Sequence, residues 1–119
     1  MSIGVIGLGT MGKNLALNIA KKSDKVHVYN RSWKKVDNFV ESASKLYVNN
    51  FVIHSNPVAL ARSVDNIVVM LPNGKPVDKL VMTLQENLKG KTMIDGSNEH
   101  FKCSSVRGRR VSKLGGKYL

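Results

Sequence analysis

The chain has 119 residues, of which 42% are hydrophobic and 23% are charged, and it contains a single cysteine. This length suits one domain with its own core and is short for a two-domain enzyme. No apolar run is long enough to span a bilayer, and the N-terminus lacks the basic region and long apolar stretch of a signal peptide. We therefore expect a cytoplasmic, disulfide-free protein that does not associate with membranes.

Lysine and arginine total 19 against 8 acidic residues, which gives a net charge of +11. Such an excess favours an anionic partner, either nucleic acid or a phosphorylated small molecule. The basic residues are spread along the chain, and one Trp, three Tyr and three Phe leave few rings for stacking bases. We expect a phosphorylated small molecule and no nucleic acid.

The first part of the chain predicts a strand, a helix, a second strand and a second helix. Residues 3–6 and 26–29 are apolar runs of strand length. The first helix shows apolar spacings of four, and Ser32 is a suitable N-cap for the second. The residues expected on the buried faces are Met11, Leu15, Ala16, Ile19 and Ala20 in the first helix, and Trp33, Val36 and Val40 in the second.

The rest of the chain continues the alternation. Asn56 before Pro57 predicts a capped short helix over 58–63, after a short strand at 51–53. Residues 67–71 are continuously apolar, which predicts a central strand covered on both faces. The remaining expected elements are an amphipathic helix with Val77, Leu80, Val81, Leu84 and Leu88 inward, a strand at 92–94 with an exit loop at 95–98, a basic helix at 104–113, and the start of a strand at 117–119.

A glycine-rich motif follows the first strand and opens the first helix. It reads Gly7-Leu8-Gly9-Thr10-Met11-Gly12, a G-x-G-x-x-G pattern in the context that dinucleotide binding requires. The first glycine permits a tight turn, the second lets the backbone approach a pyrophosphate, and the third lets the helix pack closely on the strand. A plain strand-to-helix turn is the alternative. The motif and the alternating elements together predict an α/β, Rossmann-type doubly wound fold, with a mainly parallel sheet and helices on both faces.

The second strand ends at Asn30-Arg31-Ser32, where an NAD-specific site would usually offer an acidic residue to the ribose. A neutral Asn30 does not repel a 2′-phosphate, Arg31 can bind that phosphate through a fork of donors, and Ser32 can add a hydroxyl. An exposed arginine beside an asparagine turn is the alternative. We expect NADP as the cofactor.

These residues resemble a known family, the 6-phosphogluconate dehydrogenases, which use NADP to convert 6-phosphogluconate to ribulose 5-phosphate. The matching strings are GLGTMGKNLALNIA, VYNRS and IDGSNEHF, and the similarity extends over essentially the whole chain. The resemblance implies that Gly7 to Gly12 and Asn30 to Ser32 contact the cofactor, that Leu71, Pro72 and Asn73 lie near it, and that Asn98 lies near both nicotinamide and substrate. It also implies a homodimer for the full-length enzyme.

Some features depart from this family. Met70-Leu71-Pro72-Asn73 is closer to the loop of the β-hydroxyacid dehydrogenases, which leaves that family as an alternative, and a non-catalytic NADPH-binding module is another. The family's catalytic acid, lysine and histidine all lie beyond the last residue of this chain, so we expect no catalytic residue and no turnover here. Cys103 and the three histidines lack the spacing of a metal site or catalytic triad, and we expect no bound metal.

Overall fold

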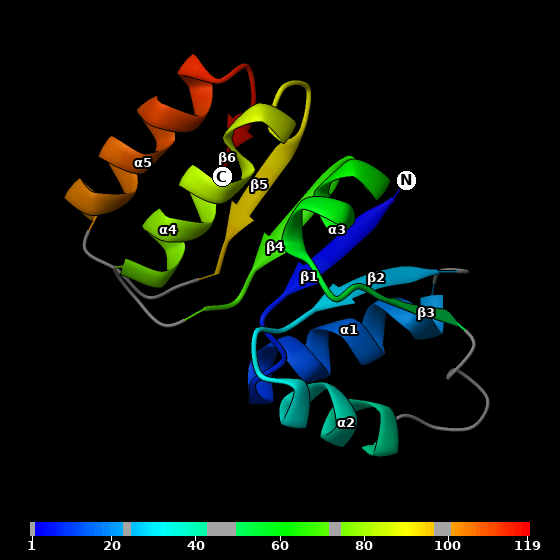
Figure 1. Ribbon diagram of the computed structural model, residues 1–119. Coiled ribbons are helices and arrows are strands. Elements are labelled where there is room, and N and C mark those ends of the chain that lie inside the picture. Colours follow the sequence, from blue (N-terminus) through cyan, green and yellow to red (C-terminus); the bar gives the residue numbers. More distant parts are fainter. Residues whose placement is uncertain (1, 23–24, 43–49, 72–74, 97–100) are drawn as a thin grey trace.

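A computed structural model describes residues 2–22, 25–42, 50–71, 75–96 and 101–119. Its centre is a six-stranded sheet in the order β3-β2-β1-β4-β5-β6, and every neighbouring pair is parallel (Figure 1). The strands are β1 (Ile3–Ile6), β2 (Val26–Tyr29), β3 (Phe51–Ile53), β4 (Asn66–Val69), β5 (Thr92–Asp95) and β6 (Lys117–Tyr118). From β1, the chain adds β2 and β3 on one side and then crosses over to add β4, β5 and β6 on the other side, as in a doubly wound fold.

Helices connect successive strands. They are α1 (Thr10–Lys22), α2 (Trp33–Ser42), α3 (Pro57–Ser63), α4 (Lys75–Leu84) with the 3-10 turn η2 (Gln85–Asn87), and α5 (Phe101–Lys113). The predicted cap of α3 is confirmed, because the Asn56 side chain accepts a hydrogen bond from the Val58 N–H at 2.7 Å. In the described part of the chain, no helix is long and apolar enough to cross a membrane.

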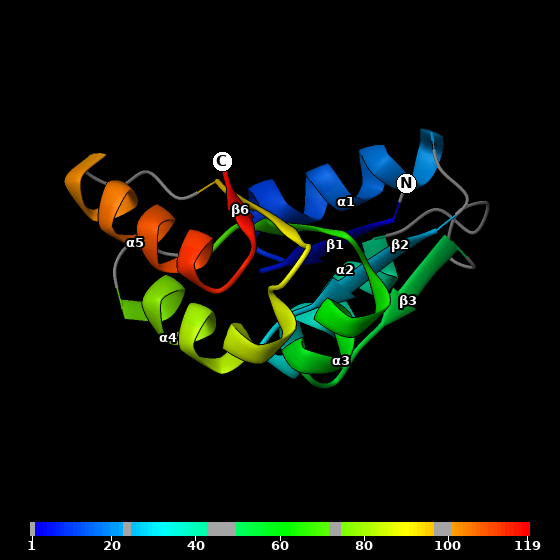
Figure 2. The same ribbon diagram turned by 90° about the horizontal axis from the view of Figure 1, so that it is seen from above.

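Two hydrophobic cores lie on opposite faces of the sheet, because successive strand residues point to opposite sides. Val5 of β1 belongs to the core beneath α1 and α2, whereas its neighbour Ile6 belongs to the core beneath α3, α4 and α5. Figure 2 shows these helices distributed around the sheet. The predicted α/β fold with helices on both faces is therefore confirmed. The predicted inward face of α4 is also confirmed, since Val77, Leu80, Val81 and Leu84 are all buried. Leu88 is buried as predicted too, although it follows η2 and does not belong to α4.

The predicted buried faces of the first two helices need correction. The buried residues of α1 are Gly12, Ala16 and Ala20, whereas Met11 is 70% exposed. Ala16 and Ala20 are buried as predicted, and at Gly12 the helix comes so close to the glycine loop that a Cβ would lie 1.9 Å from the Gly7 carbonyl oxygen. In α2, Trp33 is 58% exposed. The sheet side of α2 is formed by Val36 and by Phe39, whose ring packs edge-on against Phe51 of β3.

The central strand β4 also differs from its prediction. It ends at Val69, and its burial alternates, with Ile67 and Val69 buried and Val68 only half-buried. One face of β4 lies against the α3–α4 core, whereas its other face is incompletely covered. The apolar run therefore predicted a central strand correctly, but the prediction that both faces of this strand are fully covered was wrong.

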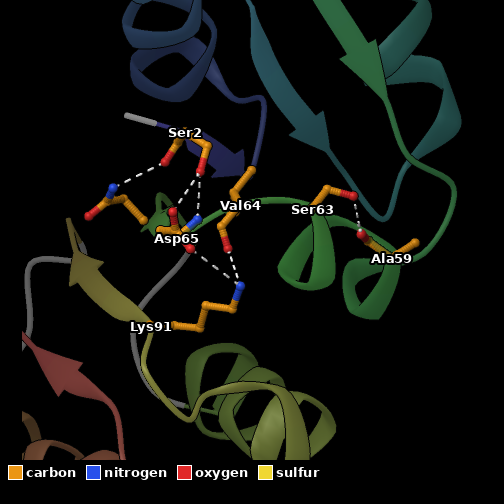
Figure 3. Close-up of polar contacts among 7 residues, drawn as sticks. Ser2, Ala59, Ser63, Val64, Asp65 and Lys91 are labelled. Atoms are coloured by element: carbon orange, nitrogen blue, oxygen red, sulfur yellow. Dashed lines mark hydrogen bonds and ion pairs between the residues drawn. The ribbon is translucent and has the colours of Figure 1, made fainter.

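Polar side chains tie three strands together at the amino end of the sheet (Figure 3). The Ser2 hydroxyl accepts a hydrogen bond from the Asp65 N–H at 2.8 Å. The Lys91 ammonium donates to the Val64 carbonyl at 2.5 Å and forms an ion pair with Asp65 at 3.8 Å. We call Ser2, Asp65 and Lys91 the amino-end cluster. It joins the starts of β1, β4 and β5. The glycine motif lies at the other end of these strands, after the carboxyl end of β1.

Candidate functional site

A cleft of about 760 Å³ lies at the carboxyl ends of the strands. It sits where β1 separates β2 from β4, the switch point at which open α/β sheets bind ligands. Its volume falls within the usual range of small-molecule sites. The described residues that line it are Gly7, Gly9, Thr10, Met11, Gly12, Asn30, Arg31, Ser32, Lys35, Met70, Leu71, Pro76 and Gly96.

The glycine loop forms the floor of this cleft, and each glycine has a distinct role. Gly7 has a φ of +102°, and a Cβ there would lie 2.5 Å from the Met70 carbonyl oxygen. A Cβ on Gly12 would lie 1.9 Å from the Gly7 carbonyl oxygen, so the close approach of helix and strand requires glycine. At Gly9 a Cβ would meet nothing within 4 Å. The backbone at Gly9 is therefore open to an incoming group, as the motif predicts for a pyrophosphate.

The first turn of α1 provides donors at the same place. The Lys13 N–H donates to the Gly9 carbonyl at 2.8 Å, which is the first bond of the helix. The preceding N–H groups, of Thr10, Met11 and Gly12, therefore have no acceptor within the helix. Free N–H groups and the positive end of the helix dipole together suit an anionic group such as a phosphate.

The Asn30 side chain forms hydrogen bonds to two segments that line the cleft. Its Oδ1 accepts a hydrogen bond from the Leu8 N–H at 2.9 Å, and its Nδ2 donates to the Ser32 carbonyl at 3.1 Å. The side chain thus links the glycine loop to the turn after β2. Leu8 does not line the cleft, because its side chain is buried and its N–H is bonded to Asn30. The bond to Asn30 gives Leu8 a role in holding the loop, and its cofactor contact stays a prediction.

Two cations line the side of the cleft formed by β2 and α2. Arg31 was predicted, and Lys35 of α2 was not. Helical spacing could have identified Lys35, because it lies three residues after Ser32 and therefore on the same face of α2. Both cationic side chains are exposed, and no acidic residue of the described chain lines the cleft. This side of the cleft is therefore suited to a negative group.

Leu71 lines the opposite side, together with Met70, Pro76 and Gly96. Pro72, Asn73 and Asn98, which the family resemblance places near the cofactor, lie outside the described residues. The described part of the chain contains no group of three or more His, Cys, Asp or Glu side chains that could hold a metal ion. The structure therefore brings together the glycine loop, two cations and a mainly apolar wall around one cleft.

Two polar clusters outside the cleft were not predicted. The ring nitrogens His27 Nδ1 and His54 Nε2 lie 2.8 Å apart across β2 and β3, and the rings stack. Burial lowers the pKa of both histidines below the ordinary value, and the charge of His54 lowers that of His27 further. The second cluster is centred on Arg107, which is buried and forms ion pairs with Asp78 and Asp95.

Comparison with known proteins is consistent with this site. The chain is 38% identical over 123 residues to "6-phosphogluconate dehydrogenase, decarboxylating 2" of Arabidopsis thaliana, covering 98% of this chain and 25% of that protein. It is 34% identical over 119 residues to the NAD(+)-dependent decarboxylating enzyme of Bacillus subtilis, covering 99% and 25%. The chain thus spans about a quarter of the length of the curated relatives it matches.

A solved structure shows the same arrangement. The 6-phosphogluconate dehydrogenase of Plasmodium falciparum, described in complex with its cofactor NADP+ and with its substrate, superposes with a TM-score of 0.87. It is 28% identical, and the alignment covers 100% of this chain and 26% of that one. The family model described as "NAD binding domain of 6-phosphogluconate dehydrogenase" matches residues 2–119. The chain therefore belongs to the family of NAD-binding domains of 6-phosphogluconate dehydrogenase.

Proposed function

We propose that this chain binds NADP in the cleft and serves as the cofactor domain of an enzyme that oxidises and decarboxylates 6-phosphogluconate. The relatives that carry this name support the reaction and the small-molecule substrate. The full-length enzyme would act as a homodimer in the cytoplasm. The nicotinamide would supply the hydride chemistry, while the chain binds and orients it.

The observation that carries the choice of NADP is the charge at the end of β2. Arg31 and Lys35 line the cleft there, and the described lining contains no carboxylate. A 2′-phosphate brings nearly two negative charges to this point, whereas the free ribose of NAD brings none. A guanidinium can donate two hydrogen bonds to a phosphate, and the ammonium of Lys35 adds a second positive charge.

The remaining residues would hold the rest of the cofactor. The pyrophosphate would lie against Gly9 and the first turn of α1, where backbone donors are available. Asn30 would act indirectly, because its two hydrogen bonds keep the glycine loop and the Arg31 turn in a fixed relation. The nicotinamide would then extend toward Leu71 and Gly96, on the other side of the glycine loop. By the family resemblance, the groups that move protons on the substrate belong to a part of the enzyme beyond this chain.

The test is a titration of NADPH and NADH at fixed, stated salt, followed through the fluorescence of Trp33, the single tryptophan, which directly follows the cleft residue Ser32 in the sequence. A charge-assisted hydrogen bond is worth about 1.5 to 3 kcal/mol, so Arg31→Ala should weaken NADPH binding about ten- to a hundredfold. NADH binding should hardly change. Lys35→Ala should lower NADPH affinity in the same direction but less, because an ammonium lacks the fork of donors.

Lys34→Ala is the matched control. Lys34 is the neighbour of Lys35 on α2 and carries the same charge, but it does not line the cleft. It should leave the preference between the two cofactors unchanged. Equal affinity of the parent chain for NADH and NADPH would overturn the choice of NADP and favour NAD, the cofactor named for the Bacillus subtilis relative. Decarboxylation of 6-phosphogluconate by this chain alone would overturn its assignment as a cofactor domain without catalytic residues.

The obvious converse substitution, Asn30→Asp, is less informative than it first appears. A carboxylate at position 30 offers an acceptor to a free ribose hydroxyl and repels a 2′-phosphate, which favours NADH. It also replaces the Nδ2 donor to the Ser32 carbonyl with a second acceptor. The turn that carries Arg31 would then be disturbed as well, so a loss of NADPH affinity would have two causes. Arg31→Ala changes only the recognition group.

A further inference from the structure

Arg107 of α5 is 3% exposed and joins four elements at the carboxyl end of the sheet. Its Nε donates to Asp78 Oδ1 of α4 at 2.9 Å, and its Nη1 donates to Asp95 Oδ2 of β5 at 3.1 Å. The Tyr118 hydroxyl of β6 donates to the same oxygen of Asp95. We call Arg107, Asp78, Asp95 and Tyr118 the Arg107 cluster. Its two carboxylates balance a guanidinium that would otherwise be costly to bury.

Both partners of Arg107 stand next to the wall of the cleft. Asp95 is followed directly by Gly96, and Asp78 comes two residues after Pro76 on α4. Gly96 and Pro76 both line the cleft. Arg107 therefore connects the two segments that form the side of the cleft opposite Arg31, without lining the cleft itself.

Gly96 is tightly packed against Val69 and Met70, so the backbone there has little room to move. Its N–H donates to the Val69 carbonyl at 2.8 Å, and a Cβ at this residue would lie 2.2 Å from Met70 Sδ. Met70 in turn lies against the glycine loop, since a Cβ on Gly12 would lie 3.3 Å from Met70 Cβ. A shift of the chain at Gly96 would therefore press on Met70. Asp95 directly precedes Gly96, and Arg107 and Tyr118 hold its carboxylate in place.

We propose that Arg107 is a positioning residue for the nicotinamide half of the cofactor. It holds Asp95 and Asp78 at set distances, and so fixes the wall formed by Gly96 and Pro76 against which that half lies. The adenine half, at Arg31 on the other side of β1, does not depend on this wall. The inference rests on the proposed function, because it assumes that a dinucleotide occupies the cleft.

The experiment compares a whole cofactor with its adenine half. NADP+ and adenosine 2′,5′-bisphosphate are titrated against the 119-residue chain and against Arg107→Lys. Lysine keeps the positive charge but cannot hold two carboxylates in a fork. The variant should weaken NADP+ binding by roughly two- to thirtyfold, the range of indirect couplings, while the bisphosphate affinity changes by less than about twofold. A purely structural role would weaken both ligands equally.

Asp78→Asn is a gentler variant in case Arg107→Lys folds poorly, because the Asp78 side chain is 53% exposed. It should show the same selective loss to a smaller extent. Arg109→Met is the matched control, since Arg109 lies on the same helix, is exposed and does not line the cleft. It should change neither affinity. Equal losses for both ligands, or no loss in either cluster variant, would overturn the positioning role.

Failure of the proposed function would be seen in the parent chain itself and not in the Arg107 variants. If the parent chain did not bind the bisphosphate but bound NAD+, the choice of NADP would be wrong and Arg107 would still be testable. NAD+ and AMP would then replace the two probes, and Arg107→Lys should again weaken only the whole dinucleotide. If the parent chain bound no dinucleotide at all, the proposed function and the positioning role would both be wrong.

Discussion

Two ion pairs lie at opposite ends of the sheet, and they differ in how far their charged side chains are exposed to water. In the Arg107 cluster, the side chains of Arg107 and Asp95 are 2% and 4% exposed and lie 3.1 Å apart. In the amino-end cluster, those of Lys91 and Asp65 are 19% and 76% exposed and lie 3.8 Å apart. Water screens the second pair and is almost excluded from the first. The buried pair should therefore govern stability and site geometry, whereas the exposed pair should matter little.

The largest expected effect comes from removing the buried cation. Arg107→Met keeps much of the side-chain length but removes the guanidinium that pairs with the buried Asp95 carboxylate. Breaking a buried ion pair in this way costs about 3–5 kcal/mol. Urea denaturation followed by circular dichroism should show a loss of this size in the free energy of unfolding.

The control again uses the neighbouring charge. Arg109→Met removes an exposed cation from the same helix and should change the free energy of unfolding by no more than about 0.5 kcal/mol. If Arg107→Met cost less than about 1 kcal/mol, Asp95 would have found another partner or water, and the contrast between the two ion pairs would be wrong.

Much of the fold could be predicted because its signals are local. The glycine motif, the Asn56 cap and the apolar spacing of α4 each lie within a few residues, and the structure confirms the elements that they predict. Local patterns also explain the errors. Met11 follows the apolar spacing of α1, but the most deeply buried residues of that helix are the small residues Gly12, Ala16 and Ala20, which an apolar pattern does not single out.

The Arg107 cluster could not be predicted in this way. Asp78, Asp95, Arg107 and Tyr118 come from four elements, and no spacing along the chain connects them. Only the fold brings their side chains together. The same holds for His27 of β2 and His54, the residue after β3, because the pairing of these two strands brings the rings together. Local motifs thus located the loops that line one side of the cleft, whereas the contacts that hold the opposite side depend on long-range packing.

An effect of intermediate size is expected from the pair of His27 and His54, which should make the free energy of unfolding depend on pH. Burial lowers the pKa of His27 and of His54, and His27 is lowered further by the charges of His54 and Lys25. The unfolded chain therefore binds more protons than the folded chain as the pH falls below about 6.5, the ordinary value for histidine. The stabilisation is present above that pH and is lost below it. We expect a loss of about 0.5–1.5 kcal/mol, the net worth of one hydrogen bond.

Urea denaturation at a series of pH values between neutrality and mild acid measures this effect. His54→Gln removes one titrating ring and retains a polar side chain, so its free energy of unfolding should fall less steeply with acid than that of the parent chain. An unchanged slope in this variant would show that the stacked rings do not govern the acid response.

The smallest expected effect belongs to the exposed ion pair of the amino-end cluster. Asp65→Asn removes the negative charge but leaves the Asp65 backbone N–H bonded to the Ser2 hydroxyl, and Lys91 keeps its bond to the Val64 carbonyl. The asparagine amide oxygen can still accept the hydrogen bond that the Ser2 hydroxyl donates to the Asp65 carboxylate at 3.4 Å, so the main loss is the screened attraction to Lys91. The free energy of unfolding should therefore fall by about 0.2–1 kcal/mol at low salt. In about 1 M salt, where the screening length is about 3 Å, the difference between variant and parent should nearly vanish. Denaturation at both salt concentrations tests this expectation. A loss of several kcal/mol, or one that persisted unchanged in high salt, would mean that this pair behaves like Arg107 and Asp95, and that exposure does not separate the two ends of the sheet.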